Sequence, residues 1–252
     1  MNIYFPRNIF TELIRDSFSE QMQGNVEYFP GAMVTNEILK NKNSVGLIPT
    51  FDLIKHKELF VSKSFGVSFE SDLCNSYLYF LSQGKDIKSI YLSGDVTSNE
   101  AVGAKLILKE LYSTEVELNL LTEGKLEEGK NILLVGDNNF NEDRFINGVS
   151  FAEEIIEVLS LPYINYVLAS TDKSALENFH KSISDTQTKI YNLVEEKNFG
   201  EGISSTARAT IREGISSFIC KFDEQDIEGI NQLLRLPFFH EIISDIIEIN
   251  FV

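Results

Sequence analysis

Few residues of this chain are suited to forming a disulfide or binding a transition metal. The sequence has no tryptophan, two cysteines and three histidines among its 252 residues. Zinc and redox sites usually show closely spaced ligands, whereas here no CxxC spacing occurs and the histidines are scattered. We therefore expect two buried, reduced thiols and no metal site, although three distant histidines could still converge in space. The residues concerned are Cys74, Cys220, His56, His180 and His240.

Positive charge is also scarce. Lys and Arg total 22 against 38 Asp and Glu, which gives a net charge of -16 at pH 7. Because proteins that bind nucleic acid usually carry a basic stripe, we do not expect a nucleic-acid partner. The same acidity would slow the approach of an anionic metabolite. Any site for such a metabolite must therefore be locally cationic.

Long apolar runs are missing as well. No stretch of the sequence approaches the roughly 18 apolar residues that cross a bilayer, so no membrane association is expected. Residues 1–7 do not contain a basic segment followed by a long apolar one, and so they do not match a secretory signal. On this basis we expect a cytoplasmic protein.

The sequence contains enough apolar residues for one large domain or two lobes. Its predicted strands and helices alternate in two blocks. Hydrophobic residues make up 43% of the chain and aromatic residues 11%. The alternation predicts a parallel sheet in each block. The first block has predicted strands at 2–5, 25–29 and 44–49 with helices at 9–22 and 32–42. The second has predicted strands at 87–92, 116–121 and 132–135 with helices at 98–112 and 151–159.

The remaining segments connect these blocks. Two longer strands look antiparallel and could carry the chain out of one lobe, a later strand returns it, and a mostly helical tail follows. These segments are 59–67 and 73–81, then 163–169, then helices at 175–197, 208–222 and 224–236, with a final strand at 246–252. No linker rich in Pro, Gly or Ser occurs. We expect an α/β protein with two lobes discontinuous in sequence, residues 1–80 and 170–252 forming the first and 85–165 the second.

Several predicted strands end in polar residues, and ligands of open α/β sheets bind at the carboxyl ends of strands. Asp137 follows a buried strand and Gly136, where it could bind a substrate hydroxyl or only cap the next turn. Arg7 follows the first strand and can hold a carboxylate through two parallel hydrogen bonds, which makes it our leading anchor for a substrate. Thr50 ends the third strand in the matching place.

The segment Thr97 to Glu100 is a capping box that starts a helix directly after a strand. Free N–H groups and the helix dipole suit such a place to a carboxylate ligand. Glu100 would compete with that ligand, however. The same pattern also begins at Ser150 and at Ser174, so a purely structural role explains it equally well.

Three strand motifs together resemble those of the chorismate dehydratases and related enzymes of the futalosine route to menaquinone. The motifs are Ser-Val-Gly-Leu-Ile-Pro-Thr at 44–50, Asn-Ile-Leu-Leu-Val-Gly-Asp at 131–137 and Leu-Pro-Tyr-Ile-Asn-Tyr-Val at 161–167. The resemblance implies the fold of the type II periplasmic binding proteins, with a ligand cleft between two lobes. It runs from the first strand to the helical tail.

The resemblance also implies roles for particular residues. Ser76, preceded by Asn75, matches a serine that the family carries before a strand, and Thr97 with Ser98 matches half of a Ser-Arg-Thr-Ser-like segment. The other half is replaced by Asp95 and Val96, which puts neutralisation of substrate charge in doubt. Asn8 corresponds to an asparagine in the turn after the first strand. Tyr163 could stack on a ring-shaped ligand or only pack in the core.

The implied activity is a lyase that removes water from chorismate without a metal or an organic cofactor. Ser76 and Asp137 would serve proton transfer or stabilise the leaving group, while Arg7, Thr97 and Ser98 would hold carboxylates. One alternative is a non-catalytic protein that binds a small anionic metabolite in the same cleft. Another is the sister enzyme that cleaves a cyclic futalosine product. A monomer and a homodimer are both compatible with the sequence.

Overall fold

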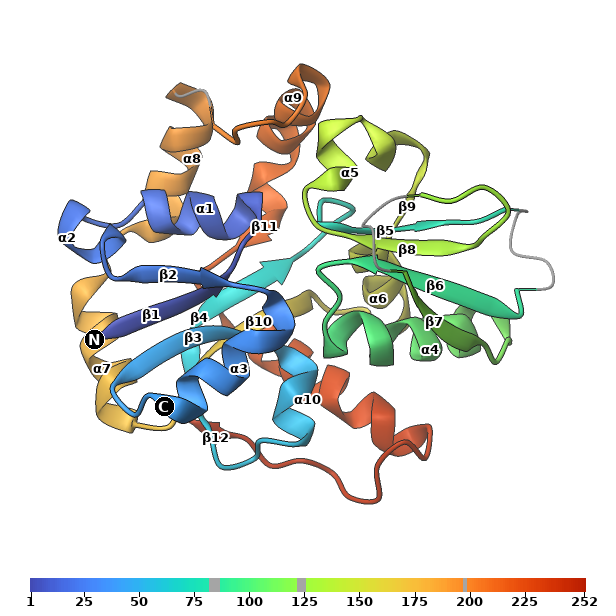
Figure 1. Cartoon of the computed structure of the whole chain (residues 1–252). Helices are drawn as coiled ribbons and strands as arrows, with labels where there is room; N and C mark the ends of the chain where they lie inside the picture. Colours follow the sequence, from blue (N-terminus) through green and yellow to red (C-terminus); the bar gives the residue numbers. More distant parts are fainter. Residues whose placement is uncertain (82–86, 122–125, 197–198) are drawn as a thin grey trace.

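The computed structural model describes residues 1–81, 87–121, 126–196 and 199–252, which form two α/β lobes side by side (Figure 1). Each lobe contains its own sheet. Within the described residues the first sheet has seven strands and the second has five. Both chain termini lie in the first lobe, because the chain crosses to the second lobe and returns.

The first sheet has the strand order β11-β4-β10-β3-β1-β2, with β12 paired to β4. β1 is parallel to β2 and β3, which confirms the predicted βαβαβ arrangement, while β10 is antiparallel to β3 and β4. β3 and β10 are buried along their whole length, which explains why they read as continuous apolar runs. The strands are β1 (Asn2–Pro6), β2 (Val26–Phe29), β3 (Ser44–Pro49), β4 (Phe60–Phe69), β10 (Tyr163–Ser170), β11 (Phe218–Ile219) and β12 (Asn250–Phe251).

The second sheet has the order β7-β6-β8-β5-β9. β6 pairs in parallel with β7 and β8, as the second βα block predicts, and β5 pairs antiparallel with β8 and β9. The carboxyl ends of β6 and β8 therefore meet at one edge of this sheet. The strands are β5 (Ser76–Tyr79), β6 (Ser89–Gly94), β7 (Glu117–Leu121), β8 (Ile132–Val135) and β9 (Val149–Ser150).

Helices cover both sheets (Figure 1). In the first lobe α3 packs on β1 and β3, α7 packs on β3, β4 and β10, and α10 packs on β10. The helices of this lobe are α1 (Ile9–Asp16), α2 (Glu20–Gln23), α3 (Gly31–Lys40), η1 (Thr50–Ile54), α7 (Lys173–Ser182), α8 (Thr186–Glu196), α9 (Ser205–Gly214), η3 (Ile215–Ser217) and α10 (Glu224–Phe239). Those of the second lobe are α4 (Ser98–Tyr112), α5 (Asn138–Asn141), η2 (Arg144–Asn147) and α6 (Phe151–Leu159). Among the described helices, none has both the length and the apolar character that a membrane span requires.

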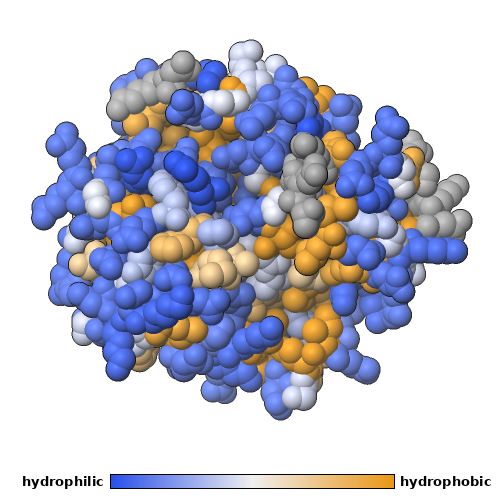
Figure 2. Space-filling model, in the orientation of Figure 1, coloured by the Kyte–Doolittle hydropathy of each residue, from blue (hydrophilic) through white to orange (hydrophobic). Residues whose placement is uncertain are grey.

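The two lobes share a continuous apolar core. Phe140 of the second lobe lies 6.2 Å from Phe10 of the first between ring centroids, and Phe151 lies 5.9 Å from Tyr163. Hydrophilic residues cover most of the face shown in Figure 2, with hydrophobic residues mainly in its middle and lower right. These apolar contacts between the lobes hold the facing edges of the lobes in a defined arrangement. Cys74 and Cys220 are buried free thiols, as expected.

Several predicted elements differ from the structure. The helix predicted at 208–222 ends at Gly214, because η3 follows directly and Phe218–Ile219 form β11, which pairs with β4. The final strand predicted at 246–252 is shorter, since β12 contains only Asn250–Phe251.

The strands predicted at 59–67 and 73–81 do not pair, because β4 and β5 belong to different sheets. The helix predicted at 9–22 is divided, since Ser17 ends α1 and α2 starts only at Glu20. The helix predicted at 175–197 is divided near Asp185, whose φ of 54° no helix can continue through. Its predicted last residue, 197, lies outside the described residues.

The strands suggest where the chain passes between lobes. Residues 76–79 belong to the second sheet, whereas the predicted first lobe extended to residue 80, and all of β10 belongs to the first sheet. We propose crossings at 70–75 and at 160–162. Residue 85, the predicted start of the second lobe, lies outside the described residues.

Candidate functional site

A cavity of about 500 Å³ opens between the lobes. One wall comes from the turn after β1, and the opposite wall comes from the carboxyl ends of β6 and β8 and from α5. This is the edge at which open α/β sheets bind ligands. The lining residues are Arg7, Glu12, Gly94, Asp95, Val135, Gly136, Asp137, Asn138, Asn141 and Glu201. We call this cavity the cleft.

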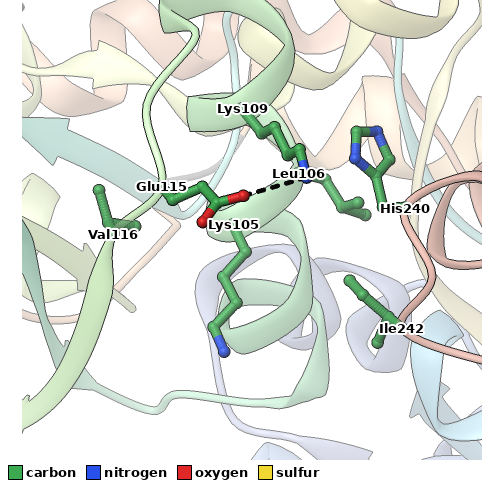
Figure 3. Close-up of a pocket in the computed structure, with 7 residues that line it drawn as sticks. All are labelled: Lys105, Leu106, Lys109, Glu115, Val116, His240 and Ile242. Atoms are coloured by element: carbon green, nitrogen blue, oxygen red, sulfur yellow. Dashed lines mark hydrogen bonds and ion pairs between the residues drawn. The ribbon is translucent and has the colours of Figure 1, made fainter.

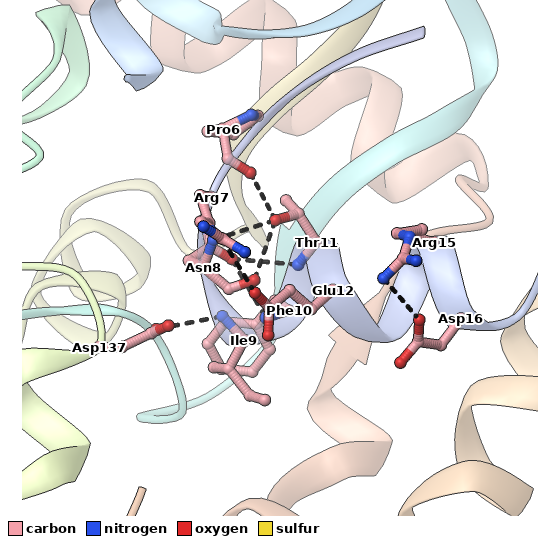
Figure 4. Close-up of polar contacts among 10 residues, drawn as sticks. All are labelled: Pro6, Arg7, Asn8, Ile9, Phe10, Thr11, Glu12, Arg15, Asp16 and Asp137. Atoms are coloured by element: carbon pink, nitrogen blue, oxygen red, sulfur yellow. Dashed lines mark hydrogen bonds and ion pairs between the residues drawn. The ribbon is translucent and has the colours of Figure 1, made fainter. Parts of the chain in front are cut away.

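Asp137 reaches from the second lobe to the start of a helix in the first. Its Oδ1 atom accepts a hydrogen bond of 3.1 Å from the backbone N–H of Ile9, the first residue of α1 (Figure 4). Burial raises the pKa of Asp137 to about 6, and the neighbouring Glu12 carboxylate adds to this, although the bond from Ile9 acts in the opposite direction. Asp137 therefore changes charge near neutral pH.

Asp95 makes the corresponding contact from the end of β6. Its two carboxylate oxygens lie 2.9 and 3.0 Å from the backbone nitrogen of Gly31, the first residue of α3. Burial raises the pKa of this carboxyl group too. Two carboxylates of the second lobe thus accept N–H groups at the positive ends of two helices of the first lobe.

Arg7 is the single cation that lines the cleft among the described residues. Its Nε atom lies 3.4 Å from Oε1 of Glu12, its guanidinium carbon lies 5.4 Å from the centre of the Tyr28 ring, and its side chain is 72% exposed. The arginine predicted as the main anchor therefore stands at the cleft, already beside a carboxylate.

Of the nine predicted site residues, Arg7 and Asp137 line the cleft, and the other seven are not among its lining residues. Asn8 is buried and caps α1 through its side chain. Thr50 is fully buried, and its hydroxyl donates to the carbonyl oxygens of Ile164 and Asn165. Tyr163 is buried and donates to Asn165 Oδ1.

Ser76 and Thr97 meet at a buried carboxyl group. The Ser76 hydroxyl donates to Oε1 of Glu100 at 3.1 Å, and the hydroxyl and backbone N–H of Thr97 donate to Oε2 at 2.7 and 2.9 Å. Burial raises the pKa of Glu100, and the hydrogen bonds from Thr97 and Ser76 oppose this rise. Ser98 begins the same helix, and its buried hydroxyl has no hydrogen-bond partner among the described residues. The capping box is therefore formed as predicted, around a buried acid.

A second polar group joins the lobes, and sequence reasoning missed its main members. The side chain of Asn99, in α4, donates to Asn165 in β10 and accepts the N–H of Phe51 at 3.0 Å. Asn75 accepts a hydrogen bond of 3.3 Å from the side chain of Asn165. Two signals pointed to this contact: a polar residue inside the apolar strand 163–169, and a second polar residue inside the capping box.

We expect Asn99→Ala to lower the free energy of unfolding by about 2 kcal/mol, because it leaves the buried N–H of Phe51 and the side chain of Asn165 without this partner. Urea denaturation measures the change. Asn178→Ala, which removes an exposed amide on α7, is the control and should change stability by less than about 0.5 kcal/mol. Equal stabilities of the two variants would contradict the role given to Asn99.

A smaller cavity of about 220 Å³ lies away from the cleft, between α4 and the segment after α10 (Figure 3). It is lined by Lys105, Leu106, Lys109, Glu115, Val116, His240 and Ile242. Lys109 pairs with Glu115 at 3.2 Å, and His240 lies 2.6 Å from Glu110. Lys109 and His240 thus each have a carboxylate partner, whereas Lys105 points away from Glu115 in Figure 3. None of the predicted site residues lines it.

No protein-family model and no curated protein matches the sequence. Solved structures do resemble the fold. Protein AF1704 from Archaeoglobus fulgidus has a TM-score of 0.63 at 13% identity, covering 96% of this chain and 98% of its own. The periplasmic aliphatic sulphonate binding protein SsuA from Escherichia coli has a TM-score of 0.63 at 11% identity, covering 99% and 90%. A ligand binding component of an ABC-type import system from Staphylococcus aureus has a TM-score of 0.55 at 9% identity, covering 99% and 96%.

These likenesses extend over nearly the whole chain and over nearly the whole of each neighbour. At such low identities they establish the fold and nothing about the ligand. The chain has the two-lobed α/β fold of the periplasmic binding proteins, as the sequence motifs predicted.

Proposed function

We propose that this protein binds a small molecule in the cleft between its lobes. The observation that carries the proposal is the cleft itself, whose volume of about 500 Å³ lies within the usual range for small-molecule sites. Its walls come from both lobes and present charged groups and amides at the ends of strands. Two of its neighbours in fold, SsuA and the import component from Staphylococcus aureus, are described as binding proteins, which supports the same role here.

The test is a thermal-shift screen of a defined set of metabolites that includes aliphatic sulphonates, simple amines and chorismate. A ligand present at about 100 times its dissociation constant adds roughly 2.7 kcal/mol of stability. For a chain of this size we expect the melting temperature to rise by roughly 5–11 °C.

Asn141→Trp is the matched variant for the screen, because residue 141 is exposed at the cleft wall and an indole there would fill part of the cavity. Asn178→Trp places the same ring on an exposed site of α7 and serves as the control. A true cleft ligand should lose its shift in the first variant and keep it in the second. A ligand that shifts both variants equally binds elsewhere, and no shift with any compound would count against the proposal.

A second candidate is the lyase that the sequence motifs suggest, acting on chorismate. The observation that favours it is Asp137, a cleft carboxyl group with a pKa of about 6 that can exchange a proton near neutral pH. In this candidate Asp137 is the proton-transfer group. Ser76 is 2% exposed and donates to Glu100, so it would act by holding that buried acid in place.

Turnover of chorismate distinguishes the two candidates. It is measured in the tubes of the thermal-shift screen as loss of the absorbance of non-aromatic chorismate. Turnover that disappears in Asp137→Asn while the fold is retained would favour the lyase. A thermal shift with chorismate but without turnover would favour the binding protein.

A further inference from the structure

Resting on the proposed binding function, we infer that the ligand of the cleft carries a positively charged nitrogen, as an amine or a quaternary ammonium compound does. The inference comes from the charges on the cleft wall. Four carboxylates line it, against one guanidinium, among the described residues. The carboxylates are those of Glu12, Asp95, Asp137 and Glu201, and the guanidinium is that of Arg7.

Arg7 offsets these carboxylates only in part. Its Nε atom faces Glu12, its guanidinium lies over the ring of Tyr28, and most of its side chain is in solvent. An exposed pair of this kind is screened by water and contributes little. Among the described residues of the cleft wall, no cation therefore forms an ion pair with Asp95, Asp137 or Glu201, and Arg7 acts on Asp137 only from a distance.

Asp95 and Asp137 are also held in position to meet a ligand. Each accepts a backbone N–H from a helix of the first lobe, which orients its carboxylate across the gap between the lobes. A carboxylate has about four acceptor positions. Among the described residues, the side chain of Asp137 accepts a bond from Ile9 through Oδ1, which leaves Oδ2 for a donor on the ligand. A ligand ammonium group placed between these two residues could bind both with charge-assisted hydrogen bonds.

The carboxylates of the cleft repel one another when no cation is present. Besides burial, the charge of Glu12 raises the pKa of Asp137, and the charge of Asp95 adds a smaller rise, while the bond from Ile9 and the charge of Arg7 lower it. The helix ends that would otherwise attract an anion are already taken by Asp95 and Asp137. The charges of this cleft therefore favour a cationic ligand over the small anionic metabolite expected from the sequence, since an anionic ligand needs a locally cationic site.

Isothermal titration calorimetry with two matched probes tests the inference. Putrescine and succinate both have four-carbon chains but carry two ammonium groups and two carboxylates, respectively. We expect putrescine, spermidine or choline to bind and succinate not to bind. We also expect Asp95→Asn and Asp137→Asn each to weaken amine binding by at least about tenfold, and rising salt to weaken it further.

The asparagine variants keep an acceptor oxygen for the N–H groups of Gly31 and Ile9, so the fold should persist, which circular dichroism checks. Glu213→Gln, which removes an exposed carboxylate of α9 away from the cleft wall, is the control and should leave amine binding unchanged. Binding of succinate that strengthens in the asparagine variants would overturn the inference but leave the proposed function standing.

If none of these amines binds to the folded protein, the inference is also overturned. The proposed function is judged separately, by whether any compound of the thermal-shift screen binds in a manner that Asn141→Trp abolishes. The two failures are therefore distinguishable.

Discussion

Gly94→Ala is expected to lower the free energy of unfolding by about 3–5 kcal/mol, the largest effect that we predict for a single methyl group. Gly94 ends β6 with a φ of +92°, and a Cβ atom there would lie 2.0 Å from the carbonyl oxygen of Val135. That oxygen accepts the N–H of Asp95 at 3.3 Å. The added methyl group would therefore separate β6 from β8 and move Asp95 away from Gly31.

Gly129→Ala is the matched control for this experiment. Gly129 also has a positive φ, +79°, but a Cβ atom built there meets no other atom within 4 Å. The control should lose only the roughly 1–2 kcal/mol of the left-handed backbone conformation. Chemical denaturation of both variants measures the difference, which isolates the clash with Val135. Equal losses would mean that β6 and β8 can separate at little cost.

The sequence was a good guide to the parallel strands of both sheets, because β1, β3 and β8 are short apolar runs whose burial leaves a recognisable pattern. It was a poorer guide to β4 and β5. Both are partly apolar strands close in sequence, and local pattern does not reveal that they pair in different sheets.

The sequence predicted which residues follow the strands better than it predicted what each of those residues does. Arg7 and Asp137 follow buried strands, and so their presence at the cleft follows from the topology of the sheets. The contact between Asp95 and Gly31 could not be foreseen. It joins residues 64 positions apart in different lobes and depends on how the lobes meet.

The buried polar residues show a further limit of sequence reasoning. Ser76 and Thr97 were candidates for contact with ligand, through the family resemblance and the free N–H groups of a helix start. In the structure their hydroxyls donate to the buried carboxyl group of Glu100 instead, as buried polar groups usually find partners. Only the relative placement of β5 and α4 distinguishes these outcomes.

Asp137→Asn is expected to make the protein more stable than the wild type at pH 7. The difference in free energy of unfolding between variant and wild type should grow by about 3 kcal/mol as the pH rises from below 3.8 to above 6. The folded protein raises the pKa of Asp137 from 3.8 to about 6, chiefly through burial. Between these values the folded state holds a proton that the unfolded state has released. The contribution of this group to stability therefore falls as the pH rises through that range, and asparagine, which does not titrate, removes the loss.

The comparison must be between variant and wild type at each pH, because Glu12, Asp95, Glu201 and Arg7 line the same cleft and also carry charge. Urea denaturation at several pH values from 3.5 to 7.5 supplies the curves. Glu213→Gln, an exposed carboxylate replaced in α9, should differ from wild type by less than about 0.5 kcal/mol throughout. A variant that is less stable at pH 7 than wild type would show that the bond from Ile9 and the dipole of α1 outweigh the burial of the charge. Asp137 would then favour contact between the lobes in its ionised form, and the cleft would hold its negative charge at neutral pH without a ligand.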